Sequence, residues 1–266
     1  MKKLSLRELQ LVTLDILKYF DKVCAKNNIQ YSLGGGTLIG AVRNSGFIPW
    51  DDDIDVYMHR DQYEKFVKIW NNEKHDQYEL SLAEDIHGMI SGEMTKIFDK
   101  NTTLIDTKGR KSGIFIDIFI WDGVPNEPDV IYKVMKKHRR LKLRFSSCRK
   151  RWYKAKDNTL IKSMFAKLSN YLFNKMMLNL KRFQDKYPID KTEYIGLVLS
   201  DYGGWKKSYM PKKYFDSVVY LDFEDSKFPV MNGYHEHLTM YYGDYMKLPP
   251  ENEQKPQHTI EAYVLD

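Results

Sequence analysis

The 266-residue chain contains 29% charged and 42% hydrophobic residues, a composition typical of a globular protein with a sizeable core. No run of about 18 apolar residues occurs in it, so no membrane-spanning helix is predicted. The formal net charge is only +6, but twelve Lys or Arg and no Asp or Glu lie between Lys133 and Lys156. This basic stretch is either a solvated helix face or a patch that meets an anionic surface, such as lipid headgroups or a polyphosphate substrate.

The first half of the chain predicts alternating helices and strands. Ser5 and Glu8 have the spacing of a helix capping box, and apolar residues then recur at helical spacing as far as Val23. The elements predicted after this helix are a strand at 29–33, a helix at 37–43, a strand at 53–58, a helix at 60–70 and strands at 78–83, 93–99 and 114–121.

The second half of the chain begins with predicted helices and ends in shorter elements. These are helices at 129–145 and along an apolar stripe from Ile161 to Phe183, short strands and turns after Pro188, and helical patches at 235–241 and 258–263. Together the elements predict an α/β fold with a mixed sheet and flanking helices. The predicted regions are a catalytic core at 1–125, a basic helical insertion at 126–190 and a C-terminal region at 191–266 packed on the core.

The two cysteines, Cys24 and Cys148, lie far apart in the sequence and have no metal-ligand spacing. No disulfide framework is indicated, so we expect a cytoplasmic, reducing environment. Charged side chains interrupt the residues that follow the basic start of the chain, and no export signal is predicted.

Four carboxylates, those of Asp51, Asp52, Asp53 and Asp55, fall within five residues. They repel one another unless a cation or strong hydrogen-bond donors compensate them. Residues two apart on a strand point to the same face, so Asp53 and Asp55 are expected to converge while Ile54 enters the core. Two convergent carboxylates suit a hard divalent cation. The alternative is a solvated acidic loop, which the apolar flanking residues disfavour.

Asp117 lies in a segment, 114–120, that is otherwise almost wholly apolar. An ionised carboxylate in a buried strand costs several kcal/mol unless it is paired or bound to a metal. A salt bridge to a buried Arg or Lys is one explanation. We favour the other, in which Asp117 is a third metal ligand beside Asp53 and Asp55.

Gly35, Gly36 and Thr37 follow a predicted strand and open a predicted helix. Glycines let backbone amides approach a phosphate closely, and the helix N-terminus adds a favourable dipole. The pattern matches neither the Walker A motif nor the dinucleotide-binding motif. Lys96 is a candidate for a cationic contact with the same phosphate, with a solvated lysine as the alternative, and Arg43 could make a similar contact.

The order of strand, Gly-Gly turn, helix, Asp-x-Asp and a later lone Asp is the order seen in the nucleotidyltransferase fold. More closely, the chain resembles the LicD family. The segments that carry the resemblance read GGTLIGAVR at 35–43, GFIPWDDDID at 46–55, KIFD at 96–99, IDIF at 116–119 and YGDYMKLPP at 242–250. The region from about 125 to 190 matches only loosely.

The resemblance implies a transferase that moves phosphocholine from CDP-choline to a sugar hydroxyl of a cell-surface glycan, of the teichoic acid, capsule or lipopolysaccharide type. Relatives such as fukutin-related protein use other CDP-activated alcohols, so transfer of ribitol phosphate or glycerol phosphate is an alternative. True nucleotidyl transfer is another, because the same metal site serves both reactions. A nucleic-acid-binding module is the non-enzymatic alternative; we expect no nucleic-acid partner, because the acidic cluster would repel a phosphate backbone.

In the expected mechanism, Asp53, Asp55 and Asp117 bind Mg²⁺, with Mn²⁺ as the alternative, and the metal bridges the phosphates of the donor. Asp51 or Asp52 takes the proton of the acceptor hydroxyl; Asp117 does so instead if only the other pair binds metal. Trp121, Tyr202, Trp205 and Tyr242 are aromatic candidates for contact with a choline group, each with a core position as its alternative.

The glycan acceptor is expected to be lipid-linked. The basic stretch and the apolar stripe from Ile161 to Phe183 would then hold the protein at the inner face of a membrane with anionic lipids.

Overall fold

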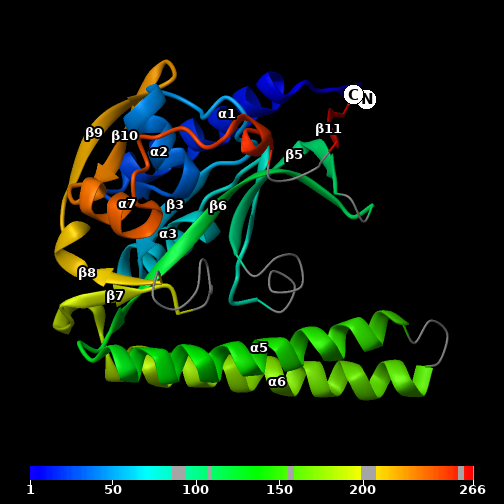
Figure 1. Cartoon of the computed structure of the whole chain (residues 1–266). Helices are drawn as coiled ribbons and strands as arrows, with labels where there is room; N and C mark the ends of the chain where they lie inside the picture. Colours follow the sequence, from blue (N-terminus) through cyan, green and yellow to red (C-terminus); the bar gives the residue numbers. More distant parts are fainter. Residues whose placement is uncertain (86–93, 107–108, 155–158, 199–207, 257–260, 266) are drawn as a thin grey trace. The chain divides into compact units, whose positions relative to one another are not determined.

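The computed structural model describes residues 1–85, 94–106, 109–154, 159–198, 208–256 and 261–265. The chain divides into two compact units (Figure 1). The first unit contains Met1–Ser81, Thr95–Phe119 and Lys213–Asp266, and the second contains Leu82–Met94 and Ile120–Lys212. Residues from both ends of the sequence therefore share the first unit.

A sheet forms the centre of the first unit. Its strands are, in spatial order, β1 (Lys2–Lys3), β11 (Glu261–Val264), β5 (Thr95–Ile105), β6 (Lys111–Val124), β3 (Asp55–His59) and β2 (Ser32–Leu33), with β4 (Tyr78–Ser81) also paired to β5. The strand pairs β1–β11, β11–β5, β5–β4, β5–β6 and β2–β3 are antiparallel. Because β5, β6 and β3 are neighbours in this order, residues distant in sequence meet in the middle of the sheet.

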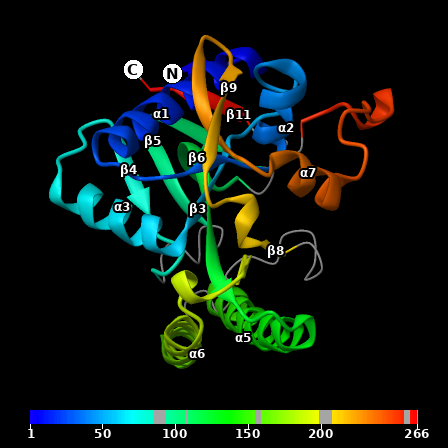
Figure 2. The same ribbon diagram turned by 90° about the vertical axis from the view of Figure 1, so that its left-hand side faces the viewer.

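Helices and one hairpin cover the sheet of the first unit. The helices are α1 (Leu6–Lys26), α2 (Gly35–Asn44), α3 (Arg60–Asn72) and α7 (Tyr234–Tyr242), with 3-10 turns at Lys212–Tyr214 and Glu251–Glu253; the hairpin consists of β9 (Val218–Phe223) and β10 (Ser226–Met231). Figure 2 shows α1 and α3 on one side of the sheet and α7 on the other. The expected α/β class with flanking helices is confirmed.

The capping box predicted for the first helix is present. The Oγ of Ser5 accepts a hydrogen bond from the amide of Glu8, and the carboxylate of Glu8 accepts one from the amide of Ser5, at 3.3 and 2.8 Å. The apolar face of the helix is buried, and Ile16, Leu17 and Phe20 on this face are 0% exposed. Sequence pattern and packing therefore agree along α1.

The prediction of a helix at 258–263 is wrong for residues 261–263, which the structure describes. Residues 257–260, with His258, lie outside the described residues, and Glu261–Val264 form strand β11. Ala262 pairs with Leu104 of β5 and is buried. So short a segment has little helical preference of its own, and its backbone pairing with the edge of β5 determines its conformation.

The second unit contains a helical pair and short strands. Helices α5 (Pro128–Lys154) and α6 (Thr159–Lys186) pack along one another, as Figure 1 shows. The last residues of β6 pair with β7 (Tyr194–Gly196), and β7 pairs with β8 (Tyr209–Pro211); a 3-10 turn spans Ile189–Lys191. The core between the helices contains Leu141, Phe145, Cys148, Leu172, Phe173 and Met176. No helix within the described ranges has the length and apolar content needed to cross a bilayer.

Candidate active site

The predicted carboxylates gather at one place in the first unit. Asp51, Asp52 and Asp53 lie in the loop before β3, Asp55 is the first residue of β3, and Asp117 lies on β6. Asp53, Asp55 and Asp117 each offer one carboxylate oxygen, and these oxygens lie within 4.8 Å of one another. Oxygens of Asp51, Asp52 and Asp53 meet the same condition, so Asp53 belongs to both groups.

A backbone contact between two segments brings these carboxylates together. The strand predicted at 53–58 begins only at Asp55, so Asp53 is held by the loop rather than by strand alternation. The amide of Asp117 donates to the carbonyl of Ile54 at 2.8 Å, which fixes β6 beside the acidic segment. Ile54 is fully buried, as predicted.

The glycine turn lies directly against the carboxylates. Gly35 has φ +49°, which disfavours residues with a β-carbon, and a β-carbon there would overlap the carboxylate of Asp55. A β-carbon on Gly36 would lie 2.6 Å from Oδ2 of Asp51. The N-cap residue Gly34 makes no side-chain hydrogen bond to the first turn of α2, and an uncapped helix N-terminus is a favourable place for a phosphate.

Hydrogen bonds join the glycine turn to β3. The amide of Gly34 donates to the carbonyl of Asp55, and the amide of Asp55 donates to Oγ1 of Thr37, both at 2.9 Å. The amide of Gly35 donates to the hydroxyl of Tyr57 at 3.0 Å. The hydroxyl of Thr37 therefore positions Asp55. Of the groups of Thr37, the backbone amide is then the one available to a phosphate.

Lys96 forms a buried ion pair with Asp117. The two residues are opposite one another in the β5–β6 register, and Nζ of Lys96 lies 2.5 Å from Oδ1 of Asp117. The ammonium also lies 3.4 Å from the centroid of the Phe115 ring. Lys96 is only 8% exposed, so it is not a solvated lysine. The salt bridge considered for Asp117 is thus present, and Asp117 also belongs to a group of carboxylates that can hold a metal.

Burial and mutual repulsion make the acidic cluster costly without a cation. Burial, and then the charges of Asp53 and Asp52, raise the pKa of Asp51 to about 8. Burial, and then the charges of Asp53 and Asp117, raise the pKa of Asp55 well above its ordinary value. Several converging carboxylates in a largely buried site form the oxygen-rich ligand set that hard divalent cations prefer. The residues therefore fit a metal such as Mg²⁺.

Arg43 lies away from the glycine turn. It occupies the last turn of α2, about 12 Å along the helix from Gly35. Its guanidinium donates to the carbonyl of Tyr245 and to Oδ1 of Asn44, each at 3.1 Å, and burial lowers its pKa. The arrangement ties α2 to the segment after α7, and the predicted phosphate contact of Arg43 stays a prediction.

Two supporting residues were missed from the sequence. Nε2 of Gln10 donates to the carbonyl of Asp51 at 2.9 Å, and Gln10 is buried on α1. A glutamine on the core-facing side of an amphipathic helix is a signal that could have revealed it. Tyr57 lies two residues after Asp55 and therefore on the same face of β3, so strand alternation could have indicated its contact with the glycine turn.

The aromatic candidates for a choline contact differ in position. Trp121 is fully buried, so it is a core residue of the second unit. Tyr242, at the end of α7, is 38% exposed. Tyr202 and Trp205 lie outside the described residues.

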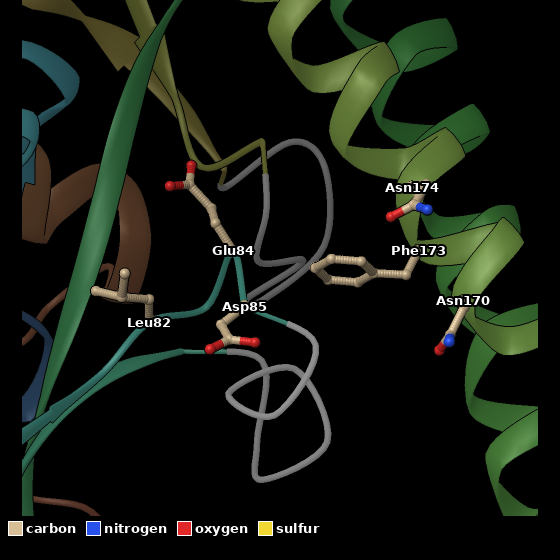
Figure 3. A pocket seen from close by; sticks show the side chains of 6 residues that line it. All are labelled: Leu82, Glu84, Asp85, Asn170, Phe173 and Asn174. Atoms are coloured by element: carbon tan, nitrogen blue, oxygen red, sulfur yellow. The ribbon is translucent and has the colours of Figure 1, made fainter. Parts of the chain in front are cut away.

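A separate cavity of about 440 Å³ lies within the second unit (Figure 3). Its lining residues are Leu82, Glu84, Asp85, Asn170, Phe173 and Asn174. Figure 3 shows Phe173 reaching from α6 into this space, across from Glu84 and Asp85. Among the residues that the structure describes, none predicted from the sequence as a site residue lines it.

A family model and a full-length relative both place the chain in one family. The family model described as LicD/FKTN/FKRP, nucleotidyltransferase domain, matches residues 28–180. Over 265 residues, 100% of both chains, the sequence is 66% identical to the lipopolysaccharide cholinephosphotransferase LicD of Haemophilus influenzae. It is also 35% identical over 114 residues to an uncharacterized protein of Rickettsia prowazekii, with 41% of this chain and 39% of that protein covered. Since a full-length relative and a family model that spans more than half of the chain agree, this chain belongs to the LicD family.

Proposed function

We propose that the chain transfers phosphocholine from CDP-choline to a sugar hydroxyl of lipopolysaccharide in a Mg²⁺-dependent reaction. The observation that carries the proposal is the convergence of Asp53, Asp55 and Asp117 beside the glycine N-terminus of α2. The full-length relative named as a lipopolysaccharide cholinephosphotransferase supports the choice of donor alcohol and acceptor. We expect the acceptor to be lipid-linked when it is modified.

Asp53, Asp55 and Asp117 would hold the metal, which supplies positive charge beside the phosphates of the donor. The amides of Gly36 and Thr37 would donate to a phosphate oxygen, because the start of a helix leaves such donors without helical partners. Lys96 would hold Asp117 in place and offset part of the negative charge of the site.

The acceptor hydroxyl must lose its proton as its oxygen attacks phosphorus. The new bond joins this oxygen to the phosphorus of phosphocholine, and the bond to CMP breaks, so that CMP leaves with the electron pair. Asp51 or Asp52 would take the proton. Asp117 is the weaker candidate for this role, because its carboxylate is already paired with Lys96.

Donor and metal can be tested together with purified protein and a lipooligosaccharide that lacks phosphocholine. CDP-choline, CDP-ribitol and CDP-glycerol would be offered separately, with EDTA and with added Mg²⁺ or Mn²⁺, and CMP release would be measured. Release from CDP-choline that requires the metal supports the proposal. Release from CDP-ribitol or CDP-glycerol alone would replace the donor alcohol and keep the reaction class.

The carboxylates can be tested with a matched pair of variants. Asp53→Asn should abolish CMP release without lowering the melting temperature, because it removes a metal ligand while conserving volume. Asp222→Asn is the control, since Asp222 lies on β9 of the same unit and its side chain is 64% exposed. Turnover retained by Asp53→Asn would refute the proposed metal site.

A further inference from the structure

The outward face of α6 is apolar, although the helix already has a buried face. Its inward residues are Ser169, Leu172, Phe173, Met176, Leu180 and Phe183. Six of its large apolar residues are exposed: Ile161, at 40%, borders the other five, which are Leu160, Met164, Leu168, Tyr171 and Leu178, with exposures of 83%, 55%, 42%, 59% and 50%. At about 100° per residue these five side chains fall within an arc of about 80°, so they form one continuous stripe. We call them the outer stripe.

The outer stripe differs from the stripe predicted from the sequence. That prediction ran from Ile161 to Phe183 and contained Leu172, Met176, Leu180 and Phe183, all of which are buried. These four residues are core residues, so their expected contact with a membrane is wrong, whereas Ile161 of the same stripe is 40% exposed. Leu168, which is 42% exposed, belongs to both sets.

Basic side chains lie along the outer stripe. Lys167, Lys175 and Arg182 are exposed, and their helical positions fall within or beside the same arc. Nζ of Lys175 lies 5.7 Å from the ring centroid of Tyr171, so the two side chains share this face. Long basic side chains can lay their methylene groups along an apolar surface while the charged end stays in water.

The charge of the whole chain is concentrated on the same pair of helices. Within the bounds of α5 and α6 there are seventeen Lys or Arg and two Asp, a formal net charge of +15. Because the complete chain has +6, all other residues together carry −9. Charge separated in this way favours attraction to an anionic surface from a distance.

We propose that the outer stripe of α6, with Lys167, Lys175 and Arg182, binds the surface of a bilayer that contains anionic lipid. An apolar stripe flanked by basic residues is typical of helices that lie in the headgroup region. A second copy of the chain is a poorer occupant, because two facing stripes would bring their basic residues together. Nucleic acid would match the charge and leave the five large apolar side chains without a partner.

The test is flotation of the full chain with vesicles of phosphatidylcholine, with and without phosphatidylglycerol. Binding should require phosphatidylglycerol. The variant Met164→Ser/Leu168→Ser/Leu178→Ser should bind at least about tenfold more weakly, since three inserted side chains are lost. Leu11→Ser is the control, because Leu11 lies on α1 of the other unit at 44% exposure and should bind like the unmodified protein.

Lys167→Gln/Lys175→Gln keeps the stripe apolar and tests charge alone. About 1 kcal/mol per basic residue at an anionic surface converts to a loss of about 25-fold for the pair. This variant also decides the question if the serine variant fails to fold. Asp53→Asn should float like the unmodified protein, so failure of the proposed reaction would not affect the result.

Three outcomes would overturn the proposal. They are equal binding to both kinds of vesicle, unchanged binding of the serine and glutamine variants, and absence of flotation. A further experiment identifies the occupant if the protein does not float. If the unmodified protein sediments as a dimer and the serine variant as a monomer, the outer stripe binds a second copy of the chain.

Discussion

Replacing Lys96 with Met should strongly destabilise the first unit. The Lys96 and Asp117 side chains are only 10% and 11% exposed, and their charged atoms are 2.5 Å apart. Removing one partner of a buried ion pair leaves the other charge buried, which costs about 3–5 kcal/mol. For a chain of this size, that corresponds to a fall in melting temperature of roughly 10 °C. Methionine keeps much of the contact with Phe115, so the loss reports mainly on charge.

The assay is thermal unfolding of the metal-free protein, followed by circular dichroism. Lys227→Met is the matched control: Lys227 pairs with Asp222 at 3.4 Å, but both side chains are more than 60% exposed, so the change should stay within about 0.5 kcal/mol. The double variant Lys96→Met/Asp117→Asn should recover much of the loss, because neither member of the ion pair is then left as an unpaired buried charge. Excess Mg²⁺ should raise the melting temperature of Lys96→Met, since the cation would replace the lost positive charge.

The reasoning would be refuted if Lys96→Met were no more destabilising than Lys227→Met. It would also be refuted if the double variant were as unstable as the sum of the two single variants, because that result would show no energetic coupling between Lys96 and Asp117.

Two further predictions concern other positions in the first unit. Gly36→Ala should reduce turnover by at least about tenfold while the protein stays folded, because the new β-carbon would lie 2.6 Å from Oδ2 of Asp51. Steady-state kinetics and a melting curve check this prediction. Full activity would contradict the close approach of Gly36 to Asp51. Burial lowers the pKa of His237 to about 4, below its unfolded value of about 6.5, so the unfolded state binds the extra proton first and stability falls as pH drops through this range. Between about pH 7.5 and pH 5 this residue should remove about 2 kcal/mol, and urea unfolding of His237→Leu should show a weaker pH dependence; equal pH dependence in both proteins would contradict the burial argument.

Features that depend on neighbouring residues in the sequence, such as helix caps and apolar spacing, were predicted correctly. The capping box of Ser5 and Glu8 and the apolar spacing behind it identified α1. The acidic segment could be recognised because its carboxylates demand compensation whatever the surrounding fold. Convergence with Asp117 was also predictable, because a carboxylate in an otherwise apolar strand needs a partner.

Features that depend on long-range register could not be read from the sequence. The pairing of Lys96 with Asp117 follows from the alignment of β5 with β6, and nothing near either residue encodes that alignment. The conformation of Glu261–Val264 is decided by the edge of β5, a distant part of the chain. On α6 both faces are apolar, so periodicity alone could not tell the face that packs on α5 from the outer stripe.

The most direct test of the central claim is mass spectrometry of the acceptor glycan after reaction with CDP-choline and Mg²⁺. Our account predicts a glycan that has gained one phosphocholine group, with an equal amount of CMP released and no product when EDTA is present. A glycan that has gained CMP instead, with phosphocholine released, would show nucleotidyl transfer and would contradict the proposed reaction.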